Sequence, residues 1–248
     1  ANLMRDVLLG HDVIHMDETP VQVLKEPGRA ASSTSQMWVQ RGGPPGKPVI
    51  LFEYDPSRAQ AVPLRLLEGW KGHLMADALE SYGAISFTEG VTRLGCWVHA
   101  RRRFVDAGKV LPEGKRGRAH EALALIGKLY AIEKEARELS DAERLARRQS
   151  QSRAVIDELR RWLDQVLPTV PPTSVLGGAL GYLHRQWPRL TRYLARGDLP
   201  IDNNPAENAI RPFVVGRKAW LFSDTQAGAR ASALIYSLVE TAKANNVE

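Results

Sequence analysis

Three acidic residues stand where they could together hold divalent metal ions. They are Asp17, at the end of the apolar run 13–16, Asp77, at the end of 73–76, and Glu207, in the first turn of an expected helix. Two metal ions about 4 Å apart can activate the attacking oxygen and stabilise the leaving oxygen of a phosphodiester. Hard cations such as Mg²⁺ bind carboxylate oxygens. The three acids therefore predict metal-dependent chemistry on a nucleic acid.

The two aspartates also have purely structural interpretations. Asp17 could cap the turn 17–20, and Asp77 could cap a helix that begins near Leu79. Glu18 competes with Asp17 for the same role. Successive residues of a strand point to opposite faces, so only one of this adjacent pair can face the site.

Glu207 has a structural interpretation as well. Asn204 could be the N-cap of its helix with Pro205 at the first helical position, and Glu207 would then close a capping box. A helix N-terminus favours an ionised carboxylate, so a cap and a metal ligand are compatible roles. Asp202, in the same loop, is a further candidate ligand.

The chain is basic, with 34 Lys and Arg residues against 28 Asp and Glu residues, a net charge of +6 and a pI near 9.6. Such an excess favours an anionic partner, although it is also compatible with an ordinary solvated surface. Two clusters are expected to contact backbone phosphates. One cluster, after the strand expected at 93–98, is Arg101, Arg102 and Arg103. The other, after Glu207, is Arg211, Arg217 and Lys218.

Cys96 and His99 form a lone Cys-x-x-His. A zinc site needs about four ligands, so this pair alone does not predict one. His99 could contact the scissile phosphate or a metal-bound water, or it could be a packed, hydrogen-bonded residue. As the single cysteine, Cys96 excludes an intrachain disulfide framework and is typical of a protein in a reducing cytoplasm.

Short apolar runs alternate with helical periods in the first hundred residues, which predicts a mixed sheet flanked by helices. The expected strands are 13–16, 37–41, 48–54, 73–76 and 93–98, and the expected helices are 59–70 and 81–88. The fold class is therefore α/β with a five-stranded sheet. Three consecutive strands, then helix, strand, helix and strand, is the order of the ribonuclease-H fold.

Strand signals stop at about residue 100, and long charged helical periods follow. The pattern predicts helices over 118–139, 141–167 and 173–195, then an extended piece over 214–222 and a closing helix over 228–245 with Leu234, Leu238 and Thr241 on one side. The expected domains are a first core segment, 1–99, an all-helical insertion, 100–200, and a last core segment with the glutamate, 201–248.

Five stretches of the chain resemble the catalytic region of the insertion-sequence 66 family of bacterial transposases. They are MDETPVQV, CWVHARRRF, DNNPAENAIRP, VGRKAWLFS and YSLVETAKANN. The resemblance runs from about Val13 to the C-terminus. It implies a ribonuclease-H-like core, Mg²⁺ or Mn²⁺, and a DDE triad that maps residue by residue onto Asp17, Asp77 and Glu207.

The resemblance implies metal-dependent cleavage and strand transfer of double-stranded DNA at element ends and target. It further implies homo-oligomers on that DNA, accessory proteins of the same element, a cytoplasmic location at the bacterial nucleoid, and N-terminal DNA-recognition segments outside this fragment. No apolar run reaches membrane-spanning length. Ala78-Leu79 replace the Gly-Tyr that usually follows the second aspartate, while Tyr82 keeps a later aromatic. Two alternatives therefore stay open: a catalytically inactive DNA-binding relative and a ribonuclease-H-like nuclease.

Overall fold

The computed structural model describes residues 2–247, which form two compact units. The sheet unit holds the chain before Leu94 and after Asp202, and the helical unit is Leu94–Asp202. Among the described residues, every helix is too short or too polar to cross a membrane.

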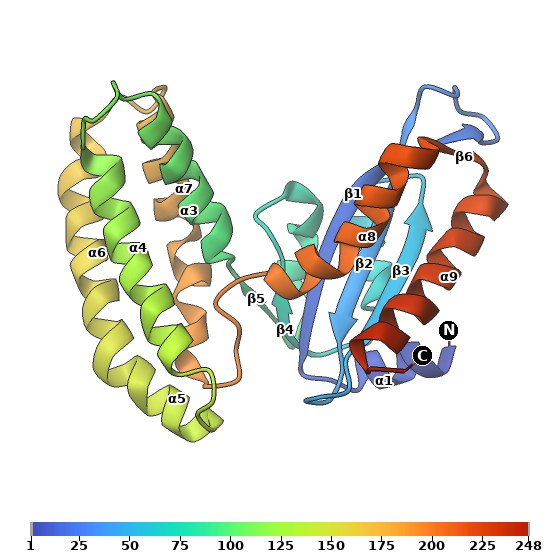
Figure 1. Cartoon of the computed structure of the whole chain (residues 1–248), viewed down its shortest axis with the longest axis horizontal. Coiled ribbons are helices and arrows are strands. Elements are labelled where there is room, and N and C mark those ends of the chain that lie inside the picture. The colour runs from blue at the N-terminus through green and yellow to red at the C-terminus, as the bar shows by residue number, and fades with distance from the viewer. Residues whose placement is uncertain (1, 248) are drawn as a thin grey trace. The chain divides into compact units, whose positions relative to one another are not determined.

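The sheet unit is built on one mixed sheet of six strands, in the order β3-β2-β1-β4-β5 with β6 also paired to β1 (Figure 1). The strands are β1 (Val13–Lys25), β2 (Thr34–Gly42), β3 (Val49–Asp55), β4 (Gly72–Met75), β5 (Val91–Leu94) and β6 (Phe222–Thr225). β1, β2 and β3 form an antiparallel meander, whereas β4 and β6 run parallel to β1. The unit is therefore an α/β structure.

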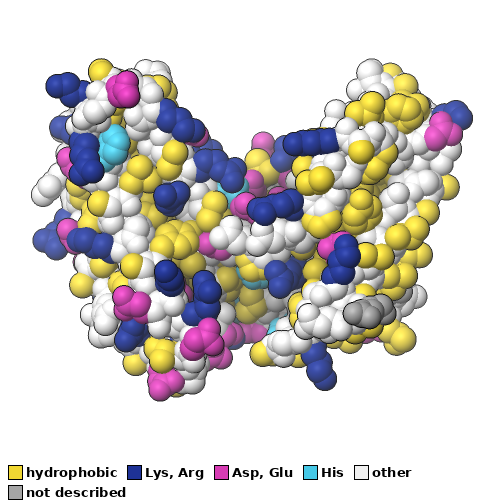
Figure 2. All heavy atoms as spheres, in the orientation of Figure 1, with side chains coloured by type: hydrophobic (Ala, Val, Ile, Leu, Met, Phe, Trp, Pro, Cys, Tyr) yellow, Lys and Arg dark blue, Asp and Glu magenta, His cyan; other side chains and the backbone are white. Residues whose placement is uncertain are grey.

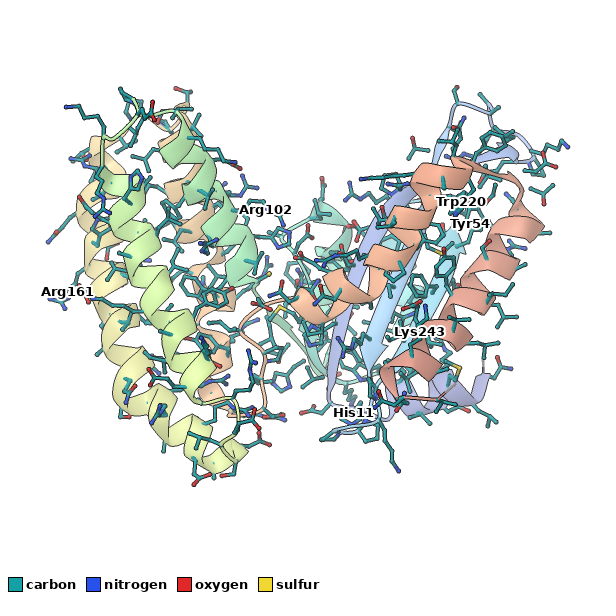
Figure 3. All side chains as sticks on the ribbon, in the orientation of Figure 1. His11, Tyr54, Arg102, Arg161, Trp220 and Lys243 are labelled. Carbon is teal, nitrogen blue, oxygen red and sulfur yellow. The ribbon has the colours of Figure 1, made fainter. Side chains whose placement is uncertain are left out.

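Side-chain alternation along the strands builds a core on each face of this sheet. On one face, here the α8 face, Val21, Val39 and Phe52 pack beneath α8 (Asn204–Trp220) and α9 (Gln226–Ala244). On the other, the α1 face, Met16 and Trp38 pack beneath α1 (Asn2–Leu9), which the sequence analysis missed, and α2 (Ala61–Leu66). Figure 3 shows Tyr54 and Trp220 in the layer between the sheet and the helices of the α8 face.

Helix α9 covers the outer edge of β3 with polar side chains spaced one turn apart. Ser237 Oγ accepts from Phe52 N at 2.8 Å, and Thr241 Oγ1 accepts from Ile50 N at 2.9 Å. An uncovered edge would offer these groups to another strand. Leu234 and Leu238, which were expected on one side of this helix, are 45% and 51% exposed, and its buried residues include Ala233 and Ser237 instead.

The predicted strand count of five is corrected to six, because the extended piece after α8 is Phe222–Thr225 and pairs with β1. The expected extended segment 214–222 is mostly helix, since α8 continues through Pro212 to Trp220. A proline inside a helix costs about 3 kcal/mol. Burial of the adjacent Phe213, which is 0% exposed and packs on the Trp220 ring at 5.3 Å, offsets that cost.

Helices fill the described helical unit between Trp97 and Ala195. The α-helices are α3 (Trp97–Lys109), α4 (Arg118–Glu135), α5 (Asp141–Arg147), α6 (Arg153–Val166) and α7 (Val175–Leu190). The expected strand 93–98 ends at Leu94, because Trp97 begins α3 and donates its indole N–H to Leu190 O at 2.8 Å. A π-helical turn, Arg148–Ser152, joins α5 to α6.

Candidate active site

The adjacent acids of β1 point to opposite faces of the sheet. Asp17 lies in the middle of the 13-residue strand, so its predicted position at a strand end, and the alternative turn 17–20, are both wrong. Its neighbours at alternate positions contact α8: His15 Nδ1 lies 3.1 Å from Asn203 Oδ1, and Thr19 Oγ1 accepts from Arg217 Nη1 at 3.0 Å. Asp17 therefore shares the α8 face, whereas Glu18 faces the α1 side.

Asp77 lies just after β4, and the pairing of β4 with β1 directs it toward Asp17. β1 and β4 are parallel, with Val13 opposite His73 and His15 opposite Met75. Continuing this register by two residues brings Asp77 next to Asp17, on the same face and about 4.8 Å away between strand axes. One carboxylate oxygen of Asp77 also accepts from Leu79 N at 2.9 Å, so the residue orders the turn after β4.

Glu207 lies in the first turn of α8, which packs on the same face. The N-cap is Asn203 rather than Asn204, so Glu207 falls one position beyond the site of a capping box. The side chain of Asn203 is turned to β1, where Nδ2 donates to Met16 O at 2.8 Å and Oδ1 lies against His15. This clamp fixes the start of α8 against the strand that carries Asp17.

The clamp also fixes the proton of His15. Because Asn203 donates to Met16 through its amide nitrogen, its oxygen faces the ring, and Nδ1 of His15 carries the hydrogen. Burial, opposed by the hydrogen bond that His15 donates to Asn203 and aided by the charge of Arg41, lowers the pKa of His15 to about 4. His15 is therefore a neutral structural link at physiological pH.

The charges of Asp77 and Glu207 act on Asp17. Burial raises the pKa of Asp17 to about 7, with the charge of Glu18 as the next cause and the charges of Asp77 and Glu207 adding to it. Like charges raise a carboxyl pKa only when they lie close by. The sheet unit thus brings Asp17, Asp77 and Glu207 into one electrostatic neighbourhood.

Two basic side chains of the sheet unit lie against this neighbourhood. Arg217 is half-buried and holds Thr19 of β1, while Arg41 of β2 donates to Pro205 O at 3.1 Å, next to the start of α8. Arg211 and Lys218 are exposed on α8. The exposed pair is available to a ligand, whereas Arg41 and Arg217 also hold the helix on the sheet.

The other predicted basic cluster belongs to the helical unit. Arg101, Arg102 and Arg103 are exposed on α3, and the guanidinium of Arg103 lies 4.3 Å from the centre of the Tyr182 ring. Figure 2 shows Lys and Arg side chains gathered over α3, and Figure 3 shows Arg102 extending from that helix. His99 is half-buried in the first turn of α3. Asp202 is also in this unit, where burial first, and then its charge, raise the pKa of the Tyr130 hydroxyl.

Comparison with known proteins identifies the chain's relatives. The family model described as "Transposase IS66 family" matches residues 1–231. The chain belongs to this family. Three proteins of Sinorhizobium fredii, "Uncharacterized protein y4hP", y4qI and y4jD, are 26%, 28% and 27% identical to it over 95% of this chain. They are matched over 45%, 45% and 47% of their own lengths, so the chain spans about half of each. No solved structure matches the chain.

In this transposase-family chain, sequence reasoning missed the residues that hold the acids in place. His15, Asn203 and Arg41 contact groups far away in the sequence, and Glu18 accepts from Tyr82 Oη at 2.6 Å. One signal could have indicated Asn203: two adjacent asparagines precede a helix start, where only one is needed as a cap. Nothing in the local pattern of β1 marks His15.

Proposed function

We propose that the chain is the catalytic domain of a DDE transposase with a ribonuclease-H-like core. The observation that carries the proposal is the parallel register of β1 and β4, which points Asp77, just beyond β4, toward Asp17, together with the helix that carries Glu207 in its first turn. The strand order 3-2-1-4-5, with an antiparallel meander followed by a parallel strand, supports the ribonuclease-H assignment. Family membership supports the transposase role.

The donor set suits Mg²⁺ or Mn²⁺, because three carboxylates supply hard oxygen ligands and leave positions for water and phosphate. Asp17, Asp77 and Glu207 would hold the metal ions. Bound there, such cations supply Lewis-acid activation of the attacking oxygen and stabilise the leaving oxygen. The raised pKa of Asp17 fits this role, since clustered carboxylates are stabilised in their ionised form by a nearby cation.

The reaction we propose has two phosphoryl-transfer steps on double-stranded DNA. Water attacks a phosphodiester at the element end, and the break leaves a free 3′-hydroxyl. That hydroxyl then attacks a phosphodiester of the target, joining the strands while the target's own 3′ oxygen leaves. Arg211 and Lys218 of α8, and Arg101–Arg103 of α3, would contact backbone phosphates. Copies of the chain would act together on DNA at the bacterial nucleoid, with accessory proteins of the same element.

The test uses labelled duplexes that carry the ends of the element encoding the chain, with Mg²⁺, Mn²⁺ or EDTA. We expect nicked product and, with target DNA added, joined product, both dependent on the cation. Asp17→Asn, Asp77→Asn and Glu207→Gln should each remove both products, whereas Glu80→Gln, an exposed acid close to Asp77 in sequence, should not. Cleavage without joining would favour a nuclease.

A second candidate is an inactive DNA-binding relative. Two observations favour it: the Ala78-Leu79 sequence after Asp77, and the hydrogen bond that Leu79 N donates to an Asp77 oxygen. DNA binding with no cation-dependent product at any concentration of protein would support this candidate and overturn the catalytic proposal.

A further inference from the structure

Glu18, the acid that faces away from Asp17, is buried and held by two donors. Its side chain is 0% exposed. Tyr82 Oη donates to Oε2 at 2.6 Å, and Arg58 Nε and Nη2 donate to Oε1 at 2.8 and 2.7 Å. A buried carboxylate beside other acids is unfavourable unless it is paired, so these contacts account for its presence. They do not explain why the strand carries an acid there.

The tyrosine that Glu18 binds is also held from the opposite end. Arg93, which is 2% exposed, donates through Nη1 to Tyr82 O and through Nη2 to Asp77 O, each at 2.5 Å. The guanidinium lies 5.3 Å from the centre of the Tyr82 ring. One planar guanidinium thus ties the backbone of Asp77 to the backbone of Tyr82.

The segment between Asp77 and Tyr82 has little regular structure of its own. A single 3₁₀ turn, Glu80–Tyr82, follows the bend at Ala78. Tyr82 is anchored in the core by an edge-to-face contact with Trp38, with ring centroids 5.9 Å apart. Asp77 lies beyond the last paired residue of β4, so contacts made by Tyr82 and Arg93 supplement the β1–β4 pairing in fixing its position.

We propose that Tyr82 is a positioning residue for Asp77, locked by the Glu18 carboxylate on β1 and coupled to Asp77 through Arg93. Glu18 serves in this arrangement as the acceptor that fixes the tyrosine, not as a metal ligand. The inference rests on the proposed function, because it assigns the network to the placement of a metal-binding carboxylate. It also assigns a role to Tyr82, the aromatic that follows Asp77 five residues later.

The experiment measures Mn²⁺ binding by the intact chain from the electron paramagnetic resonance signal of the free ion. Tyr82→Phe removes only the hydroxyl that Glu18 accepts. Partners beyond the ligands of a metal site typically contribute 10–100-fold to metal affinity, so we expect Mn²⁺ to bind about tenfold more weakly. The matched control is Tyr54→Phe in the same unit: Tyr54 is 4% exposed, and its hydroxyl has no hydrogen-bond partner among residues 2–247. It should bind Mn²⁺ like the wild type.

Asp77→Asn distinguishes a failure of the proposed function from a failure of the positioning role of Tyr82. If Asp77→Asn keeps wild-type Mn²⁺ affinity, the proposed function fails. If Asp77→Asn loses binding while Tyr82→Phe stays within twofold of the wild type, the positioning role is overturned and the proposed function stands. Thermal unfolding of both tyrosine variants distinguishes a local effect at the site from a general loss of stability. If Tyr82→Phe and Tyr54→Phe lose melting temperature and Mn²⁺ affinity equally, the positioning role of Tyr82 is also overturned.

Glu18→Gln provides a second route if Tyr82→Phe does not fold. The glutamine keeps an oxygen that can accept from Tyr82 but removes the charge that strengthens the bond, so Mn²⁺ affinity should fall less than about tenfold. A folded Glu18→Gln protein with wild-type Mn²⁺ affinity would overturn the proposal. Complete loss of binding would also overturn it, because that result indicates that Glu18 is itself a ligand.

Discussion

A buried ion pair in the helical unit and the candidate site in the sheet unit treat buried charge differently. In the helical unit, Arg148 is 2% exposed and donates to both oxygens of Glu133, at 2.8 and 2.6 Å, and to Tyr193 O. In the sheet unit, burial first, and then the charges of nearby acids, raise the pKa of Asp17. Pairing of opposite charges is what a structural role requires, whereas gathered like charges are unfavourable until a cation arrives. The difference therefore separates scaffold from candidate site without reference to motifs.

The largest expected effect distinguishes the two kinds of acid by activity. Glu207→Gln should lower DNA cleavage at least ~10³-fold, equivalent to about 4 kcal/mol of transition-state stabilisation, because it removes a proposed metal ligand. Glu133→Gln, assayed well below its melting temperature, should retain most activity. Single-turnover cleavage of an end-containing duplex measures both. Comparable losses in the two variants would abolish the distinction between the units.

The next effect concerns stability. Glu133→Gln leaves the Arg148 guanidinium buried without its carboxylate, and we expect a loss of about 3 kcal/mol in the free energy of unfolding. The control is Glu135→Gln on the same helix. Glu135 is 65% exposed and pairs with Arg147 at 3.0 Å, so its loss should change stability by less than about 1 kcal/mol. Urea unfolding of both variants gives the comparison, and equal losses would contradict it.

Removing the charge of Asp17 should stabilise the metal-free protein, whereas removing the charge of Glu133 should destabilise it. Its pKa is about 7 in the folded protein against 3.8 in the unfolded chain, so the protonated form is favoured by folding. Stability from this group is therefore fully present below pH 3.8 and is lost as the pH rises through 7. Relative to the metal-free wild type, Asp17→Asn should therefore gain stability as the pH rises from 4 to 8.

Divalent cations sharpen that prediction. Mg²⁺ or Mn²⁺ should raise the melting temperature of the wild type at pH 8 and less at pH 5, because ligand bound only by the folded state stabilises it and protons compete for the carboxylates. Asp17→Asn should gain little at either pH. A wild type that becomes more stable in EDTA as the pH rises from 4 to 8 would contradict the raised pKa.

The sequence predicted where most strands lie better than it predicted the contacts around them. Apolar runs located β2, β3 and β4 because periodicity reports burial directly. The strand β1 was cut short because Pro20 suggests a turn. In the structure Pro20 lies between the stretch of β1 that pairs with β4 and the stretch that pairs with β6, so β2 is its strand neighbour. A proline is tolerated where one side of a strand has no ladder partner.

The contacts that hold the acids could not be predicted in this way. Asn203 and His15 are 188 positions apart, and Tyr82 and Glu18 are 64 apart. Their pairing depends on how α8 and the segment after β4 dock on the sheet, which is decided by packing rather than local pattern. The facing of the two acids of β1 could be predicted only in part. Alternation along a strand predicts that Asp17 and Glu18 point to opposite faces of the sheet. Which of these faces is covered by α8 follows only from the packed structure.

The smallest expected effect tests which basic residues of α8 hold DNA and which hold the protein. Lys218 is exposed, whereas Arg217 is half-buried and donates to Thr19 Oγ1 at 3.0 Å. If Lys218 contacts one phosphate, Lys218→Ala should flatten the dependence of log K on log salt by about 0.9 and leave the melting temperature unchanged. Arg217→Ala should change both, because it also removes a contact between α8 and β1.

Lys243→Ala is the control for this measurement. Lys243 lies on α9, is 65% exposed and pairs with Glu240 at 3.0 Å, so it carries the same charge as Lys218 on a different helix of the sheet unit. Its removal lowers the net charge equally but should not alter the slope if phosphates lie along α8. Fluorescence anisotropy with a labelled duplex at several salt concentrations gives all three slopes. Equal flattening by Lys218→Ala and Lys243→Ala would mean that DNA responds to overall charge, and α8 would then lose its assigned role in holding the backbone.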